Sequence, residues 1–284
     1  MALSKNNDAD SSGSVVFFAC NYQSALHPGQ KLTPEQAFRS NKDYPDAVRE
    51  CYRAYLNAGC SVLLTNSNYP LTSHRLSDHD WEQYAAASVA RAFEVSAGKV
   101  ALWGIIRSPG PLLLPQVAQI QTRLNLYRQA VKLFLSLHCH GIFLDGFRDI
   151  VDARCALNAC GHEKVPAVSI NFDVVNVDPE QQIPEMNVST LGPALDPFQP
   201  RFILLNSPGT PAEILPYYRD FASTTHSPHG LAVNGGSPAW SHDEKLAEEL
   251  TLIGFHVLGG AEGMTPFYLE SVIKRFKDHH PPPP

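Results

Sequence analysis

The stretch GIFLDGFRDIVDARCALNA, residues 141–159, predicts a short buried strand followed by a helix. Its apolar first part, Gly141–Leu144, predicts a strand that is covered on both faces. Its last part, Asp149–Ala159, has the apolar spacing of an amphipathic helix. The carboxylate of Asp145 comes between them, directly after the strand. A strand of this kind that leads into a helix is typical of parallel α/β architecture.

The same succession recurs along the chain. Seven further apolar runs predict strands: Val15–Phe18, Ser61–Thr65, Val100–Ile106, Ala167–Ile170, Phe202–Leu205, Leu231–Val233 and His256–Leu258. Seven further segments predict helices: Pro45–Ala58, Trp81–Ala97, Val117–Leu137, Thr190–Leu195, Ala212–Phe221, Asp243–Ile253 and Thr265–Phe276. Eight such pairs predict a single-domain (β/α)8 TIM barrel over residues 14–277. The alternative is an open doubly wound sheet, which usually has fewer strands and a glycine-rich turn after the first strand.

Length and composition agree with one globular domain. The chain has 284 residues, with 44% hydrophobic and 18% charged residues, which excludes disorder over most of its length. We expect a disordered tail at residues 1–13 and a proline-rich tail at 278–284. The long polar connection Tyr22–Tyr44 is a candidate lid over the barrel mouth.

Charge and hydropathy exclude several classes of partner. The net charge is -6 and no cluster of Lys and Arg is present, so we expect no nucleic-acid partner. No apolar run approaches the ~18–20 residues that span a bilayer, so we expect no membrane association. The amino-terminal segment lacks the apolar core of a signal peptide, and the six cysteines are too sparse for a disulfide scaffold. We therefore expect a cytoplasmic protein, whose oligomeric state the sequence leaves open.

In a barrel of this kind the chemistry lies where strands end and helices begin. Two carboxylates at strand ends, Asp145 and Glu262, are candidates for a catalytic acid and base. Polar residues at the other strand ends are candidates for substrate binding: Asn21, Thr65, Asn66, Tyr69, Arg107, Asn171, Asn206, Ser207 and Asn234. Arg107 is suited to pair with a substrate carboxylate. Asn and Ser also cap helices and form turns, which accounts for part of this pattern.

Several segments resemble the homocysteine S-methyltransferase family. They are GSVVFFACNYQSAL (13–26), PDAVRECYRAYLNAGCSVLLTNSNY (45–69), ALWGIIRSPGP (101–111), residues 141–159, FILLNSPGTPAEILP (202–216) and GFHVLGGAEGMTPFYLESV (254–272). The resemblance covers about residues 13–277. It implies the same barrel and a transferase that methylates a small thiol, with zinc on three cysteines activating that thiol. It also identifies Asp145, Thr65 and Tyr69 as matching pocket positions.

The sequence departs from the family at the zinc ligands. The three cysteine positions are here Ser207, Ala261 and Glu262, and the acid of the first strand, which helps to hold the amino group of homocysteine, is replaced within Ala19–Asn21. A hydroxyl and one carboxylate do not make a tetrahedral zinc site. We therefore expect no cofactor, and zinc in particular to be absent. Without a metal a thiol keeps a pKa near ~8.5 and is only slightly ionised at neutral pH.

Three hypotheses follow. The first is a metal-independent enzyme that acts on an amino-acid-like small molecule with the carboxylates of Asp145 and Glu262, by methyl transfer, elimination, hydrolysis or isomerisation. The second is a non-catalytic binding protein that has kept the barrel. The third is zinc-dependent thiol methylation with a rebuilt metal site. The sequence does not name the substrate or a methyl donor.

Overall fold

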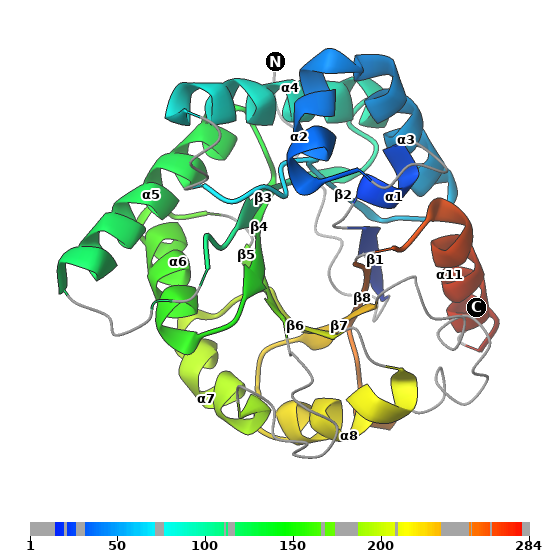
Figure 1. Cartoon of the computed structure of the whole chain (residues 1–284). Coiled ribbons are helices and arrows are strands. Elements are labelled where there is room, and N and C mark those ends of the chain that lie inside the picture. Colours follow the sequence, from blue (N-terminus) through cyan, green and yellow to red (C-terminus); the bar gives the residue numbers. More distant parts are fainter. Residues whose placement is uncertain are drawn as a thin grey trace.

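Eight parallel strands form a single sheet that curls into a barrel (Figure 1). The computed structural model describes residues 15–19, 22–26, 32–71, 77–110, 112, 117–165, 168–173, 187–207, 210–233, 250, 252–261 and 263–279. The strands are β1 (Val16–Ala19), β2 (Val62–Leu64), β3 (Ala101–Arg107), β4 (Gly141–Phe147), β5 (Val168–Asp173), β6 (Phe202–Ser207), β7 (His229–Val233) and β8 (Val257–Gly260). Their order around the sheet is β1-β8-β7-β6-β5-β4-β3-β2.

The two ends of this sheet, β1 and β2, meet and bring the barrel close to closure. The backbone N–H of Ser61 donates to the carbonyl of Phe17 at 2.9 Å, and Ser61 Oγ accepts from the N–H of Phe17 at 2.9 Å. The predicted (β/α)8 barrel is therefore confirmed.

Helices surround the sheet (Figure 1). They are α1 (Gln23–Leu26), α2 (Pro34–Asp43), α3 (Pro45–Asn57), α4 (Asp78–Ser96), α5 (Val117–Ser136), α6 (Ile150–His162), α7 (Leu191–Leu195), α8 (Pro211–Ala222) and α11 (Pro266–His279), with the 3-10 turns η1 (Val188–Thr190) and η2 (Asp196–Phe198). Two of these helices begin at residues whose side chains cap the first turn. Ser77 caps α4 by accepting from the N–H of Asp80, and Asp149 caps α6 by accepting from the N–H of Asp152.

Some sequence predictions fall outside the described residues. The predicted helix Asp243–Ile253 does so for most of its length, as do both predicted tails. α11 continues to His279, two residues beyond the predicted end of the barrel. Within the part of the chain that the structure describes, no helix combines the length and apolar character needed to cross a bilayer.

The hydrophobic core has two parts, because neighbouring side chains of a strand point to opposite faces. The larger part lies between the sheet and the helices. The smaller part fills the barrel interior and includes Phe18, Leu64, Ile105, Phe143 and Leu204. The interior is therefore closed by packed side chains below the carboxyl ends of the strands, which leaves the mouth as the place for polar groups.

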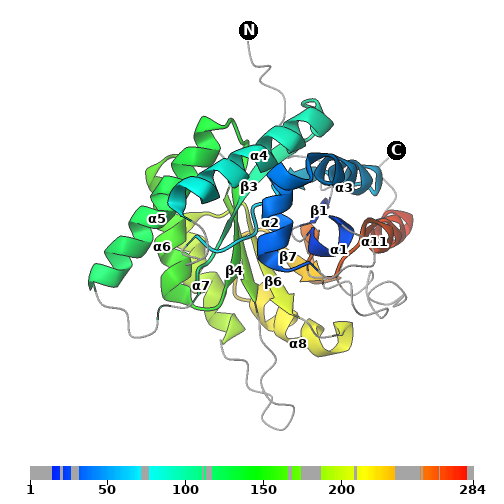
Figure 2. The same cartoon turned by 45° about the horizontal axis from the view of Figure 1, so that its top comes forward.

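The connection between β1 and α3 contains two helices that the sequence did not predict. α2 packs against α3 and α4 beside the mouth (Figure 2). Phe38 of α2 is buried and stacks on Tyr69, with ring centroids 5.5 Å apart. α2 is therefore a fixed part of the rim, whereas residues 27–31 of the candidate lid lie outside the described residues.

Candidate functional site

A layer of polar side chains lies at the mouth, directly above the apolar interior of the barrel, because side chains alternate along each strand. The interior residues Ile105, Phe143 and Leu204 are each followed, two positions later, by a polar residue at the strand end. This layer contains Arg107 of β3, Asp145 of β4, Asn171 of β5 and Asn206 of β6, with Ala261 after β8. Four predicted site residues therefore lie on four consecutive strands of the barrel, at the same end.

Arg107 and Asp145 form an ion pair at this mouth. They are paired in register across β3 and β4, and Nη1 of Arg107 lies 3.1 Å from Oδ2 of Asp145. The same Nη1 donates to Oδ1 of Asn68 at 2.9 Å. The other carboxylate oxygen of Asp145 accepts from Nδ2 of Asn171 at 2.8 Å. Asp145 is only 3% exposed, so the ion pair and the amide compensate a buried charge.

Gly146 makes room for the guanidinium of Arg107. β4 changes register between Leu144 and Phe147, and Gly146 has a φ of 73°, in the left-handed region that favours glycine. A Cβ atom at this position would lie 3.2 Å from Cζ of Arg107 and 3.4 Å from its Nη2. The guanidinium therefore lies against the backbone of the bulge. A larger residue at position 146 would displace it.

Asn68 and Gly146 are site residues that the sequence analysis did not single out. Asn68 belongs to the polar run Thr65–Tyr69, which supplied other candidates. The Asp-Gly pair at 145–146 is a common turn signal after a strand, and it is the sequence feature from which Gly146 could have been found.

Thr65 is built into the framework of the mouth. Its Oγ1 accepts from the N–H of Ile105 at 2.9 Å and shares a hydrogen bond of 2.7 Å with Oγ of Ser67. Ser67 Oγ in turn donates to the carbonyl of Ile105 at 2.8 Å. Thr65 and Ser67 are both fully buried, and together they join the end of β2 to β3.

Asn66 fastens α2 to the end of β2. Its Nδ2 donates to the carbonyl of Ala37 at 2.7 Å and to Oδ1 of Asn41 at 3.1 Å. Nδ2 of Asn41 donates back to the carbonyl of Asn66 at 2.7 Å. The N–H of Asn66 donates to the hydroxyl of Tyr52 at 2.6 Å. Both side-chain donors of Asn66 therefore have partners within the protein.

Tyr69 lies in the aromatic packing below α2. Its ring stacks on Phe38 at an interplanar angle of 11°, and its carbonyl accepts from Nε1 of Trp81 at 3.3 Å. The side chain is 5% exposed. These two contacts fix Tyr69 between α2 and α4, beside the residues of the mouth.

A second buried carboxylate, Asp152, lies beside the mouth at the start of α6. Its Oδ2 accepts from Ser108 Oγ at 2.7 Å and from the hydroxyl of Tyr127 at 2.8 Å. Its Oδ1 lies 3.0 Å from Nη1 of Arg123, which also donates to the carbonyl of Gly110. Burial raises the pKa of Asp152 above its ordinary value. These contacts fix the turn that follows Arg107.

The remaining predicted site residues concern parts of the chain outside the described residues. Asn21, Asn234 and Glu262 lie outside the described residues, as does the side chain of Ser207. The backbone of Ser207 ends β6 and is paired with Val233. Ala261 is described, is 2% exposed and belongs to the barrel interior.

The described cysteines are separate from the mouth. Cys51 lies on α3, Cys155 and Cys160 lie on α6, and Cys60 and Cys139 precede β2 and β4 at the opposite end of the barrel. All five are free and buried. Burial raises the pKa of Cys60, Cys139 and Cys160 to about 12, so these thiols are not ionised at neutral pH.

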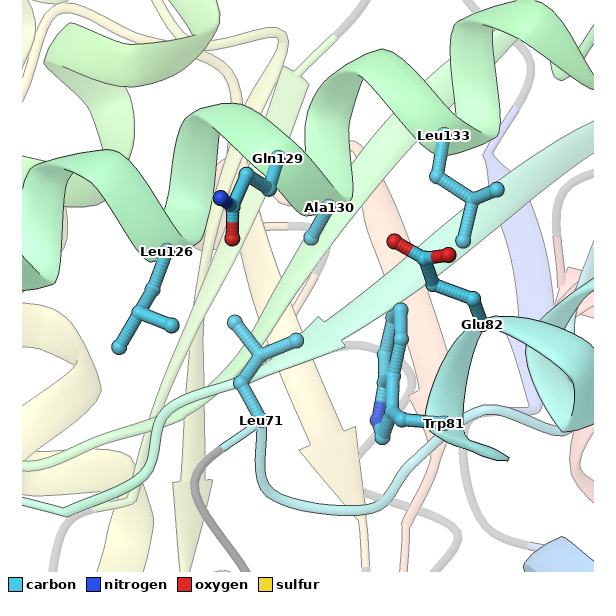
Figure 3. A pocket seen from close by; sticks show the side chains of 7 residues that line it. All are labelled: Leu71, Trp81, Glu82, Leu126, Gln129, Ala130 and Leu133. Carbon is cyan, nitrogen blue, oxygen red and sulfur yellow. The ribbon is translucent and has the colours of Figure 1, made fainter. Parts of the chain in front are cut away.

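A small cleft of about 30 Å³ lies elsewhere, between α4 and α5 (Figure 3). Leu71, Trp81, Glu82 and Leu133 are among the residues that line it. Its volume is far below the roughly 300 Å³ at which small-molecule sites begin. None of the predicted site residues lines it, so it does not compete with the mouth as the candidate site.

Comparison with known proteins identifies a family whose sequence model matches this chain. The family model described as homocysteine S-methyltransferase matches residues 21–275, which is most of the chain. No curated protein sequence matches the chain.

Solved structures support the same barrel. The homocysteine methyltransferase MmuM from Escherichia coli is similar in its oxidised form, with a TM-score of 0.75 and 12% identity over 93% of this chain and 96% of that one. Its metallated form has a TM-score of 0.73 at 13% identity, with the same coverage. The N-terminal domain of a putative aldolase from Bacteroides vulgatus has a TM-score of 0.60 and 13% identity, over 94% of this chain and 80% of that one. At such identities the likeness shows the fold alone.

Proposed function

This chain belongs to the homocysteine S-methyltransferase family, and we propose that it is a metal-independent enzyme acting on an amino-acid-like small molecule at the mouth of its barrel. The family is described as homocysteine S-methyltransferase, and the similar structure MmuM is a homocysteine methyltransferase, which supports an enzyme with a small-molecule substrate. The substrate carries a carboxylate that binds Arg107. Glu262 transfers the proton that the reaction moves.

The observation that carries this proposal is the ion pair of Arg107 with Asp145 at the mouth. Arg107 is held by Asp145 at 3.1 Å and by Asn68 at 2.9 Å, while its side chain remains 34% exposed. A fixed guanidinium with an accessible edge is well suited to bind a carboxylate through two parallel hydrogen bonds. Arg107 also lies at the end of the barrel where enzymes of this fold bind their substrates.

The contacts of Asp145 suggest a narrower role for it than the proton transfer predicted from the sequence. Both of its oxygens accept hydrogen bonds, from Arg107 and from Asn171. We therefore assign Asp145 to holding Arg107 in place, and Glu262 to proton transfer. Asn171 is proposed to hold Asp145, and Asn206 to complete the polar surface of the mouth, with Asn21, Asn234 and Ser207 as further binding candidates.

The zinc of the family does not fit the residues at this end of the barrel. Ala261 stands at one of the three ligand positions, and its methyl group offers no donor atom. Within the described residues no three His, Cys, Asp or Glu side chains come together as a metal site. The alanine at a ligand position is the observation that supports chemistry without zinc. The reactions open to the site are methyl transfer to an acceptor more acidic than a thiol, elimination, hydrolysis and isomerisation.

The proposal is tested by turnover of a panel of small amino and thiol acids, in the presence and absence of a chelator. The Glu262→Gln variant should lower kcat by about 10²-fold or more with little change in KM, because only proton transfer is lost. Asp145→Asn should chiefly raise KM, because Arg107 loses its anchor. Full activity in both variants would contradict the proposal. Binding without any turnover would favour a non-catalytic binding protein.

A further inference from the structure

Asp145, the carboxylate at the mouth that the structure describes, is already occupied, and Glu262 is assigned to proton transfer. Oδ2 of Asp145 lies 3.1 Å from Nη1 of Arg107, and Oδ1 accepts from Nδ2 of Asn171 at 2.8 Å. The carboxylate side chain is 5% exposed, so the guanidinium and the amide cover it. A substrate ammonium would have to displace Arg107 to reach this charge. The side-chain oxygen Oδ1 of Asn171 cannot bind the ammonium in place of Asp145, because it is buried.

The guanidinium of Arg107 has one edge to which no described residue forms a hydrogen bond. Nη1 has two protons, and these account for the bonds to Asn68 and Asp145. The backbone of Gly146 lies against the group, with its virtual Cβ position 3.2 Å from Cζ. Among the described residues, Nε and Nη2 have no hydrogen-bond partner, and the side chain is 34% exposed. The edge formed by Nε and Nη2 matches the two oxygens of a carboxylate.

We propose that the mouth selects its substrate by a carboxylate on the Nε–Nη2 edge of Arg107, and that it does not read an amino group. This inference rests on the proposed function and deepens it. The substrate class is the short-chain carboxylic acids, with or without an amino group. Asp145 and Asn68 are positioning residues for Arg107, and Gly146 gives the guanidinium its place.

Three matched probes test the inference on the full-length protein. Homocysteine carries both groups, 4-sulfanylbutanoate lacks the amino group, and 3-sulfanylpropan-1-amine lacks the carboxylate. Calorimetry or ligand-observed NMR gives their dissociation constants. The two acids should bind within about threefold of one another, and the amine at least roughly tenfold more weakly, as expected for the loss of a charge-assisted pair of hydrogen bonds.

The outcomes separate this inference from the proposed function. If only homocysteine binds, the inference is wrong while the proposed function stands. If the amine binds as well as 4-sulfanylbutanoate, the inference is wrong together with the carboxylate contact to Arg107, and turnover of the panel then decides whether the chain is an enzyme. If neither acid binds and the panel of acids gives no turnover, both are wrong.

The Arg107→Gln variant provides an independent check. It removes the cation and uncovers Asp145, so the two acids should lose about tenfold or more in affinity while the amine gains. Arg53→Gln, which changes an exposed arginine of α3, is the control and should leave all three constants unchanged. Unchanged binding of the acids to Arg107→Gln would overturn the inference. Should this variant fail to fold by circular dichroism, Arg107→Lys keeps the charge but not the two-pronged edge, and it should also weaken acid binding.

Discussion

Ser108 Oγ donates a hydrogen bond of 2.7 Å to Oδ2 of Asp152, and this bond joins the end of β3 to the first turn of α6. Ser108 directly follows Arg107. The N–H of Ser108 donates to the carbonyl of Asp145 at 2.8 Å, so the two sides of the residue fix the backbone next to the guanidinium. The position of Arg107 therefore depends on a carboxylate that does not itself touch it.

The first prediction concerns this buried carboxylate. Asp152→Ala leaves Arg123, Tyr127 and Ser108 without their shared acceptor, and should lower the free energy of unfolding by about 3 kcal/mol or more. Urea denaturation followed by circular dichroism measures this loss. Asp220→Asn, on the exposed side of α8, is the control and should change stability by no more than about 0.5 kcal/mol. A loss below about 1 kcal/mol for Asp152→Ala would show that the network contributes little.

The second prediction concerns Gly146. Gly146→Ala should lower the free energy of unfolding by about 1–2 kcal/mol, because its φ of 73° is strained for alanine. It should also weaken binding of a carboxylic acid, because the added methyl group would displace Arg107. Gly98→Ala is a matched control, since Gly98 has a φ of 75° and open space where its Cβ would lie. Equal acid binding by the two variants would contradict the contact with Arg107.

The third prediction is a dependence of stability on pH from His229. Burial, with a contribution from His256, lowers the pKa of His229 to about 4 in the folded protein. The unfolded chain, with a pKa near ~6.5, therefore binds more protons between these values, and stability falls as the pH is lowered from ~6.5 to about 4. The effect is at most about 3 kcal/mol.

Unfolding curves of His229→Gln across this pH range test the third prediction. The variant also loses the hydrogen bond with Tyr218, so the slope against pH is compared rather than the absolute stability. The slope should become flatter, whereas the exposed His226→Gln should keep the original slope. An unchanged slope in His229→Gln would assign the pH dependence to another group.

The order and type of the elements could be predicted because parallel strands covered on both faces leave continuous apolar runs. Phe202–Leu205 and Gly141–Leu144 are such runs, and both lie within observed strands. The end of β4 could not be predicted in the same way. The strand continues through Asp145 and Gly146 to Phe147, because a bulge and the guanidinium of Arg107 support it, and these are long-range effects.

The candidate site could be predicted only as a set of strand ends. The barrel brings Arg107, Asp145 and Asn171 together, which follows from their positions after consecutive strands. Their individual roles could not be read from the sequence. Asn66 ends a strand in the same way, yet its amide joins α2 to the rim. α2 was also not predicted, because its polar composition hides the buried face around Phe38.

The central claim is chemistry without zinc, and elemental analysis of the purified protein tests it most directly. The sample should carry His279→Gln and His280→Gln, so that the carboxyl-terminal histidines bind no metal, and should never meet a nickel column. After incubation with zinc and removal of the excess, we expect far less than one zinc per chain, because Ala261 replaces a ligand and the described cysteines lie apart. About one zinc per chain, retained through dialysis, would contradict the account and restore thiol methylation at a rebuilt metal site.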